Sequence, residues 1–179
     1  MIYCFLANGF EESEALSTVD VIRRAKLELK LVSINETYVT SSHNVTVKAD
    51  ITIDKISDYE DIDAIILPGG MPGTLNLQNS EKLRDIILYC NENNKLICAI
   101  CAAPMILGNL GLLINKDATC FPGFEKELKD ANVKTDKVVK DGNIITAKGA
   151  GVSFLFGYEI VAALLSQEEA DDIKSAMQY

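Results

Sequence analysis

Residues 95–104 read Lys-Leu-Ile-Cys-Ala-Ile-Cys-Ala-Ala-Pro, a short apolar run that ends on Cys101 and is followed by small residues compatible with a helix. In an α/β sheet, ligands bind beyond the carboxyl ends of the strands, and a residue on a sharp strand-to-helix turn is pushed into that region. A helix N-terminus also favours the thiolate form of a cysteine. Cys101 is therefore either a reactive thiol or a small buried residue, and this stretch alone leaves both open.

Further apolar runs on both sides of this stretch predict the fold. Ile2–Ala7 and Ile62–Leu67 are apolar at nearly every position, as is typical of strands buried on both faces, and Leu29–Ile34 alternates. Helices are predicted from the spacing of apolar residues and from capping residues, over 13–26, 80–93, 102–113 and 152–165, with a last one after Ser166. Strands that alternate with helices indicate an α/β protein with a doubly wound, mostly parallel sheet and helices on both faces.

Two segments depart from this alternation. Residues 37–54 are rich in Thr, Val and Ile with polar breaks, and we expect them to form a small antiparallel excursion at a sheet edge. In Val138–Ile145, two apolar runs flank Asp141-Gly142, which predicts a tight hairpin whose positive φ angles these two residues supply.

Composition limits the class of protein. The 179 residues fit a single domain, 1–179, and the net charge of −9 disfavours nucleic acid as a partner. No apolar run approaches the ~18 residues of a membrane span, and Met1–Phe5 lacks a basic leader. Five irregularly spaced cysteines fit reduced thiols better than a disulfide framework. We therefore expect a cytoplasmic protein that does not contact a membrane.

Two other turns are expected beside Cys101, at the ends of neighbouring strands. Gly69-Gly70 can bring backbone N–H groups close to a ligand and, with the N–H of Ala102, form an oxyanion hole, although a plain tight turn is the simpler explanation of the two glycines taken alone. Glu11, Glu12 and Glu14 are either a solvated helix start or include one buried, protonated acid.

Several other chemistries fit the sequence poorly. Cys98 lies inside the predicted strand, about 10 Å from Cys101, so the pair is not expected to form a disulfide. One histidine and no second cysteine pair argue against zinc, and Gly69-Gly70 lacks the rest of a phosphate loop. An amidotransferase needs a histidine after its cysteine, whereas His43 precedes Cys101. No metal and no cofactor is expected.

Five stretches together resemble the ThiJ/PfpI superfamily, in the branch of the parkinsonism-associated protein DJ-one and its bacterial relatives. They are residues 9–14, 19–25, 66–73, 99–104 and 146–154, in family order along nearly the whole chain. The resemblance implies a flavodoxin-like domain that forms a homodimer. It also implies that Cys101 is an oxidation-sensitive nucleophile, that Glu14 is the protonated acid bonded to it, and that the N–H groups of Gly70 and Ala102 line the site.

Members of this superfamily are credited with glyoxalase activity (methylglyoxal to lactate without glutathione), protein deglycation, redox sensing and chaperone-like behaviour. The leading hypothesis is thus a cysteine-dependent enzyme whose substrates are small aldehydes or glycated proteins. The alternative is a non-enzymatic redox sensor or chaperone-like stress protein that works through Cys101. We expect Cys101 to ionise well below pH 7 with Glu14 as its protonated partner, because two anions ~3–4 Å apart repel strongly.

One departure from the superfamily bears on turnover. Where many members carry a histidine in a Thr-x-His-Pro stretch, this chain reads Thr119-Cys120-Phe121-Pro122, and Phe121 cannot transfer a proton. Glyoxalase turnover would therefore lack this proton-transfer group, whereas oxidation of Cys101 does not depend on it. Cys120 is either a resolving thiol or a buried cysteine at a strand end.

Overall fold

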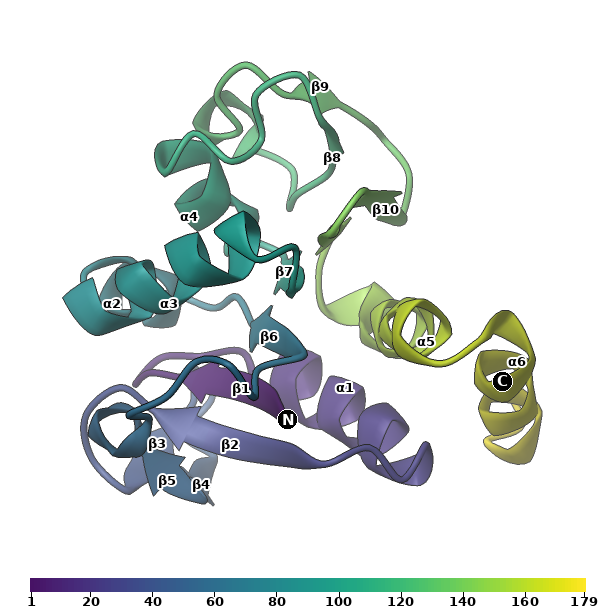
Figure 1. The fold of residues 1–179 in the computed structure, drawn as a ribbon, viewed down its shortest axis with the longest axis horizontal. Helices are drawn as coiled ribbons and strands as arrows, with labels where there is room; N and C mark the ends of the chain where they lie inside the picture. Colours follow the sequence, from purple (N-terminus) through teal and green to yellow (C-terminus); the bar gives the residue numbers. More distant parts are fainter.

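The computed structural model describes residues 1–179, which form a twisted seven-stranded sheet between two layers of helices (Figure 1). The strand order is β10-β11-β7-β6-β1-β2-β5, and every neighbouring pair is parallel except β10 with β11. The strands are β1 (Ile2–Leu6), β2 (Leu29–Ser33), β5 (Ile51–Thr52), β6 (Ala64–Leu67), β7 (Leu96–Ile100), β10 (Val138–Asp141) and β11 (Ile144–Ala147). The predicted fold class is confirmed.

The centre of the sheet is buried on both faces. Every residue of β6 and β7 is buried, which explains why these strands are apolar at consecutive positions rather than at alternate ones. The two faces carry core clusters of similar size, with 25 and 24 buried residues, so helices cover both faces about equally. Each strand therefore emerges from a rigid core and can position a residue at its carboxyl end.

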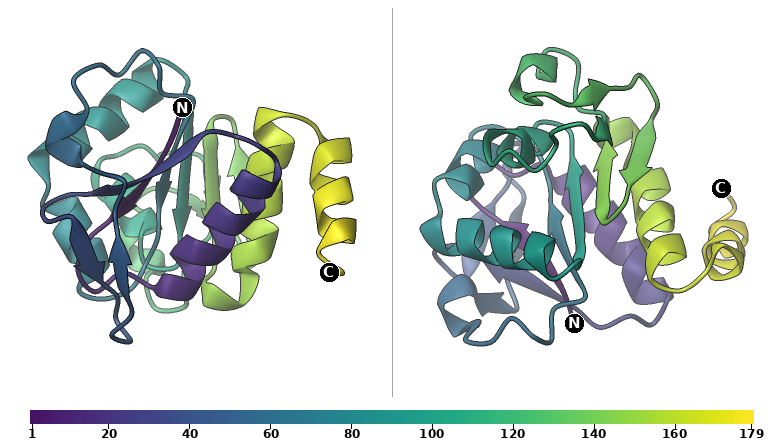
Figure 2. Two further views of the ribbon diagram at one scale, coloured as in Figure 1. Left: turned by 90° about the horizontal axis from the view of Figure 1, so that it is seen from below. Right: turned by 45° about the horizontal axis from the view of Figure 1, so that its top comes forward.

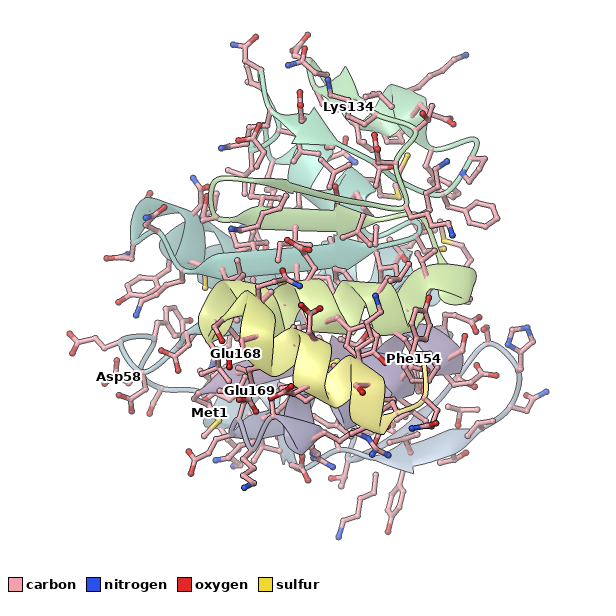
Figure 3. All side chains as sticks on the ribbon, turned by 90° about the vertical axis from the view of Figure 1, so that its right-hand side faces the viewer. Met1, Asp58, Lys134, Phe154, Glu168 and Glu169 are labelled. Carbon is pink, nitrogen blue, oxygen red and sulfur yellow. The ribbon has the colours of Figure 1, made fainter.

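The helices divide between the two faces (Figure 2). One face packs against α1 (Glu12–Arg24) and α5 (Ser153–Leu164), and the other against α2 (Gly73–Gln78), α3 (Glu81–Glu92) and α4 (Pro104–Asn109). The last helix, α6 (Gln167–Ala176), packs on the outside of α5, where Glu168 and Glu169 are exposed (Figure 3). No helix is both long enough and apolar enough to cross a membrane.

The predicted capping residues occupy their expected places. Ser80 Oγ accepts a hydrogen bond from the Leu83 N–H at the start of α3, and Ser166 Oγ accepts one from the Glu169 N–H at the start of α6. The β10–β11 hairpin is also confirmed, but Asp141 pairs with Ile144, so the loop is Gly142-Asn143. Of Asp141 and Gly142 only Gly142 has a positive φ, +59°, because Asp141 still belongs to the strand.

Residues 37–54 differ from the expected placement. β3 (Tyr38–Thr40) and β4 (Thr46–Lys48) pair antiparallel with each other in a separate two-stranded sheet, and only β5 joins the edge of the main sheet, parallel to β2. The hairpin is held by the β1–α1 turn instead: the Gly9 N–H donates to Thr40 O at 2.8 Å, and the Ser42 N–H donates to Phe10 O at 2.8 Å. Its tip therefore lies beside the start of α1.

The helix that follows Cys101, α4, is shorter than predicted. The helix ends at Asn109 rather than near Leu113. A Cβ on Gly108 would lie 2.0 Å from Glu127 O, so a glycine at this position allows the backbone around Glu127 to pack directly against the helix. The remaining elements are β8 (Asp117–Ala118) parallel to β9 (Asn132–Val133), and three 3₁₀ turns, η1 (Ile53–Lys55), η2 (Glu125–Glu127) and η3 (Ala150–Val152).

Candidate active site

Two of the turns predicted to meet at the carboxyl edge of the sheet are bonded to each other. The Glu11 N–H donates to Gly69 O at 2.9 Å, and the Gly73 N–H donates to Gly9 O at 3.2 Å. Gly70 has φ +90°, and a Cβ there would lie 2.4 Å from the Glu11 nitrogen. A glycine is therefore needed at position 70 for both its φ and its close contact with the neighbouring turn.

Cys101 occupies the strand-to-helix turn in the strained conformation expected of a nucleophile elbow. Its φ is +65°, a region that residues with a side chain seldom adopt. Its N–H donates to Ala147 O at 2.9 Å and its carbonyl accepts from the Phe121 N–H at 2.8 Å, so two neighbouring segments hold the turn. Cys101 is partly exposed, whereas the other four cysteines are buried.

Glu14 is the carboxylate that turns inward. It lies in the first turn of α1, is only 1% exposed, and its Oε2 accepts a 2.8 Å hydrogen bond from the Gly69 N–H. Its Oε1 is buried and has no hydrogen-bond partner, which favours a proton on that oxygen. A Cβ on Gly69 would lie 2.6 Å from the Cys101 Cβ and 2.8 Å from Glu14 Oε2. The side chains of Cys101 and Glu14 therefore both pack against Gly69, and only a residue without a side chain fits there.

The two groups shift each other's titration. Burial raises the pKa of Glu14 to about 7, which agrees with the expected protonated acid. Burial, followed by the charge and hydrogen bond of Glu14, raises the pKa of Cys101 to about 12. The pKa of the Cys101 thiol is thus raised, whereas the sequence predicted a lowered pKa and a thiolate well below pH 7. The backbone N–H groups of Ala102 and Gly70 lower this pKa, as predicted, but they are outweighed by burial and by an ionised Glu14.

Phe121 lies at the edge of this site. A Cβ on Gly149 would be 3.1 Å from the Phe121 ring and 3.8 Å from Glu14 Oε1, so the ring and the acid both lie next to Gly149. The ring is 46% exposed and carries no group that can accept or donate a proton. The position next to the acid is thus apolar in this chain.

Cys120 faces a different environment. It is 4% exposed, and burial together with the charge of Glu125 raises its pKa to about 11, although Lys148 lowers it. It lines a cavity of about 80 Å³ that Cys101 does not line. A role for Cys120 as a resolving thiol stays a prediction.

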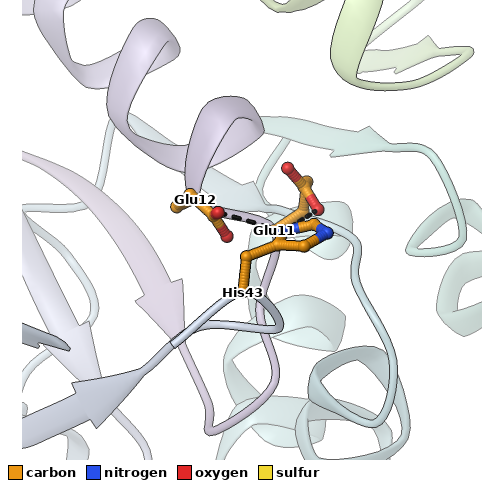
Figure 4. Close-up of side chains that lie close together, drawn as sticks. All are labelled: Glu11, Glu12 and His43. Atoms are coloured by element: carbon orange, nitrogen blue, oxygen red, sulfur yellow. Dashed lines mark ion pairs between the residues drawn. The ribbon is translucent and has the colours of Figure 1, made fainter. Parts of the chain in front are cut away.

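His43 precedes Cys101 in the chain and so does not fit an amidotransferase, yet the β3–β4 hairpin brings it to the start of α1 (Figure 4). His43 Nδ1 lies 3.0 Å from Glu12 Oε1 and 3.5 Å from Glu11 Oε2. No local pattern in the sequence signals this contact, because it depends on how the hairpin folds back. One of the two interpretations was that these glutamates form a solvated helix start; instead, Glu11 and Glu12 both pair with His43.

A cavity of about 450 Å³ on another part of the molecule does not compete as a catalytic site. Met1, Glu28 and Asp63 line it, and each of them precedes a strand of the parallel sheet, so it lies at the edge opposite Cys101. None of the residues that line it is a cysteine, serine or histidine.

The model of the DJ-1/PfpI family matches residues 1–163, and the chain belongs to this family. Within it the chain falls in the DJ-1 branch. It is 34% identical over 177 residues to Protein DJ-1alpha of Drosophila melanogaster, covering 97% of this chain and 82% of that one. It is 31% identical over 176 residues to the Parkinson disease protein 7 homolog of Danio rerio, covering 96% and 93%.

The fold comparison agrees with the sequence comparison. The structure of an oxidized DJ-1 of Toxoplasma gondii superposes with a TM-score of 0.95 at 31% identity, covering 99% of this chain and 97% of that one.

Proposed function

We propose that this protein is a cysteine-dependent enzyme that acts on reactive carbonyls, either small α-oxoaldehydes such as methylglyoxal or their adducts on proteins. The observation that carries the proposal is the position of Cys101. It is the one partly exposed thiol, and it adjoins both a buried acid and the N–H groups of Gly70 and Ala102. A nucleophile, a proton carrier and an oxyanion site are the parts that addition to a carbonyl requires.

The first step forms a hemithioacetal. Ionised Glu14 takes the S–H proton of Cys101 as the sulfur attacks the aldehyde carbon, a C–S bond forms, and the carbonyl π electrons move to oxygen. The N–H groups of Gly70 and Ala102 stabilise the developing oxyanion, and Glu14 supplies the proton that neutralises it. A pKa of about 7 suits Glu14 to this role, because such a group both donates and accepts protons near neutral pH.

For methylglyoxal the remaining steps move two protons and add one water. Glu14 takes the proton from the former aldehyde carbon and returns it to the adjacent carbon through an enediol, while the hydroxyl proton of the hemithioacetal passes to the oxygen of the adjacent carbon. This leaves a lactoyl thioester on Cys101. Water then hydrolyses the thioester to lactate and restores the thiol. The sum is methylglyoxal plus water to lactate, with no external oxidant or reductant.

The proposal is tested by adding methylglyoxal to the purified protein and measuring lactate. We expect lactate from the wild type and from Cys90→Ala, which removes a thiol of α3, and none above background from Cys101→Ser. Equal lactate from wild type and Cys101→Ser would contradict the proposal.

A second candidate is a redox sensor, supported by the partly exposed sulfur of Cys101 beside an acid and by the Toxoplasma gondii relative, whose structure is described as oxidized. Peroxide converts the thiol to a sulfenic acid and water, and a second peroxide gives a sulfinic acid and water. Glu14 would donate a hydrogen bond to one of the new oxygens. Intact-mass spectra after peroxide treatment should show a gain of two oxygens in the wild type and a smaller yield in Glu14→Leu; equal yields would remove Glu14 from this role.

A homodimer, which the family resemblance implies, is part of the proposal. Phe154 and Tyr179, whose ring centroids lie 6.4 Å apart, are exposed aromatic side chains that a partner chain would cover. Light scattering after size-exclusion chromatography should give twice the 19.6 kDa of one chain, and a monomer mass at all concentrations would contradict it.

A further inference from the structure

Phe121 places an exposed aromatic ring beside the candidate nucleophile. The ring is 46% exposed, although phenylalanine is among the residues most often buried. Its backbone is fixed to the elbow, because the Phe121 N–H donates to Cys101 O at 2.8 Å. The residue that carries the ring is therefore held against the turn that presents the thiol.

The ring also borders the acid of the site. A Cβ on Gly149 would lie 3.1 and 3.7 Å from two carbons of the Phe121 ring and 3.8 Å from Glu14 Oε1, so both groups approach the same point. Glu14 Oε1 is the oxygen without a hydrogen-bond partner. A substrate that reaches both Cys101 and Glu14 is therefore close to an apolar surface that is open to solvent.

The charges at the site are unfavourable for an anionic substrate. Glu14 raises the pKa of Cys101, and Glu11 raises the pKa of Glu14, so the charged side chains that act most strongly on this pair are acidic. Like charges repel across a few ångströms, most strongly where burial limits solvation. A neutral substrate avoids this repulsion.

We propose that Phe121 is a specificity-determining residue whose ring contacts the substituent of the substrate and selects neutral α-oxoaldehydes with an aromatic substituent over methylglyoxal. This inference rests on the proposed carbonyl chemistry and narrows its substrate class. A methyl group covers little of the ring, whereas a phenyl group stacks on it or meets its edge, and more apolar surface leaves water. The ring carries no proton, so its contribution is to binding.

Alkylation of Cys101 tests the ring without requiring turnover. Iodoacetamide and N-benzyliodoacetamide have the same reactive carbon and differ by one aromatic substituent. Peptide mass spectrometry gives the rate of each at Cys101, and N-acetylcysteine gives the ratio of the two rates without a binding site. In the wild type we expect the ratio of the benzyl rate to the plain rate to exceed that of N-acetylcysteine by at least about threefold. In Phe121→Ala this excess should disappear.

Two further variants separate the ring from other effects. Phe121→Leu keeps an apolar side chain without the ring and should give an intermediate ratio. Tyr38→Ala, which removes an exposed aromatic ring from β3, is the matched control and should give the wild-type ratio. The Phe121 variants keep the N–H that bonds Cys101 O, so the elbow is preserved. The same ratio in wild type and Phe121→Ala would overturn the proposal.

The selection for a neutral substrate has its own probe. Iodoacetate is close in size to iodoacetamide and carries a negative charge. Relative to iodoacetamide, it should react with Cys101 at least about threefold more slowly than it reacts with N-acetylcysteine. Equal relative rates at Cys101 and at N-acetylcysteine would overturn this part of the proposal.

Turnover supplies a separate readout. The kcat/KM for phenylglyoxal relative to that for methylglyoxal should be at least about fivefold lower in Phe121→Ala than in the wild type, through KM rather than kcat. If neither aldehyde is converted, the proposed function fails, and the alkylation ratios still decide the role of Phe121. If both are converted with the same relative kcat/KM in wild type and Phe121→Ala, the proposed function stands and this inference fails.

Discussion

The Gly69 N–H donates a 2.8 Å hydrogen bond to Glu14 Oε2, and this bond joins the turn after β6 to the first turn of α1. It leaves Oε1 as the buried oxygen without a partner, on the acid beside the Cys101 thiol. This contact between residues 55 positions apart occupies Oε2 and so favours Oε1 as the oxygen that carries the proton when Glu14 is protonated.

Gly69→Ala should disrupt this arrangement. The added Cβ would lie 2.6 Å from the Cys101 Cβ, which cannot be relieved by moving a flexible side-chain end. We expect a loss of about 1–3 kcal/mol in the free energy of unfolding, as for other overpacked sites, and loss of lactate formation. Gly151→Ala is the control, because a Cβ there meets no atom within 4 Å. Chemical denaturation of both variants measures the difference, and equal stability would contradict the close approach.

Cys101 should react first among the five thiols. It is partly exposed and the other four are buried, and access limits alkylation when every thiol is mostly protonated. Limiting iodoacetamide followed by peptide mass spectrometry should place most of the label on Cys101. Preferential labelling of Cys90 or Cys98 would be incompatible with the exposed elbow.

Glu14→Gln should lower the pKa of Cys101. The negative charge of Glu14 raises this pKa, so removing the charge while keeping the size of the side chain moves the thiol toward ionisation at lower pH. Titration of thiolate absorbance near ~240 nm in wild type and variant measures the shift, with Cys101→Ser as the blank. An unchanged or higher thiol pKa in Glu14→Gln would show that the two groups do not share a proton.

The same acid makes stability depend on pH. Its pKa is about 7 in the folded protein against 4.5 for an ordinary glutamate, so between these values the folded state binds more protons than the unfolded state. Stability should therefore fall as pH rises from about 4.5 to about 7, by up to ~3 kcal/mol from this group. In Glu14→Gln this part of the slope should disappear. Denaturation at several pH values tests it, and equal slopes in both proteins would contradict a buried acid.

Phe121→His should raise kcat/KM for methylglyoxal. The ring and Glu14 Oε1 both lie next to Gly149, so an imidazole in place of the ring would add a proton-transfer group worth typically 10²–10⁴-fold, and we expect at least about tenfold. Phe121→Leu is the control without a titratable group. If wild type and Phe121→His both form no lactate, the redox sensor becomes the better account of the site.

Local sequence determined much of this structure, because the relevant forces act between near neighbours. The apolar run of β7 predicts a strand buried on both faces, Ser80 and Ser166 predict helix starts, and Cys101 between a strand and small residues predicts an elbow. Each depends on side-chain periodicity or on backbone groups within a few residues.

Tertiary structure decided the chemistry of the site, because it depends on segments far apart in the chain. Three glutamates open α1, and only the packing of that helix turns Glu14 toward Gly69 and leaves Glu11 and Glu12 facing the hairpin. The sequence indicated the N–H groups that lower the pKa of Cys101 but not the burial and charge that raise it. The position of His43 depends on the β3–β4 hairpin, which does not join the main sheet. Backbone hydrogen bonds of Gly9 and Ser42 hold this hairpin against the β1–α1 turn instead.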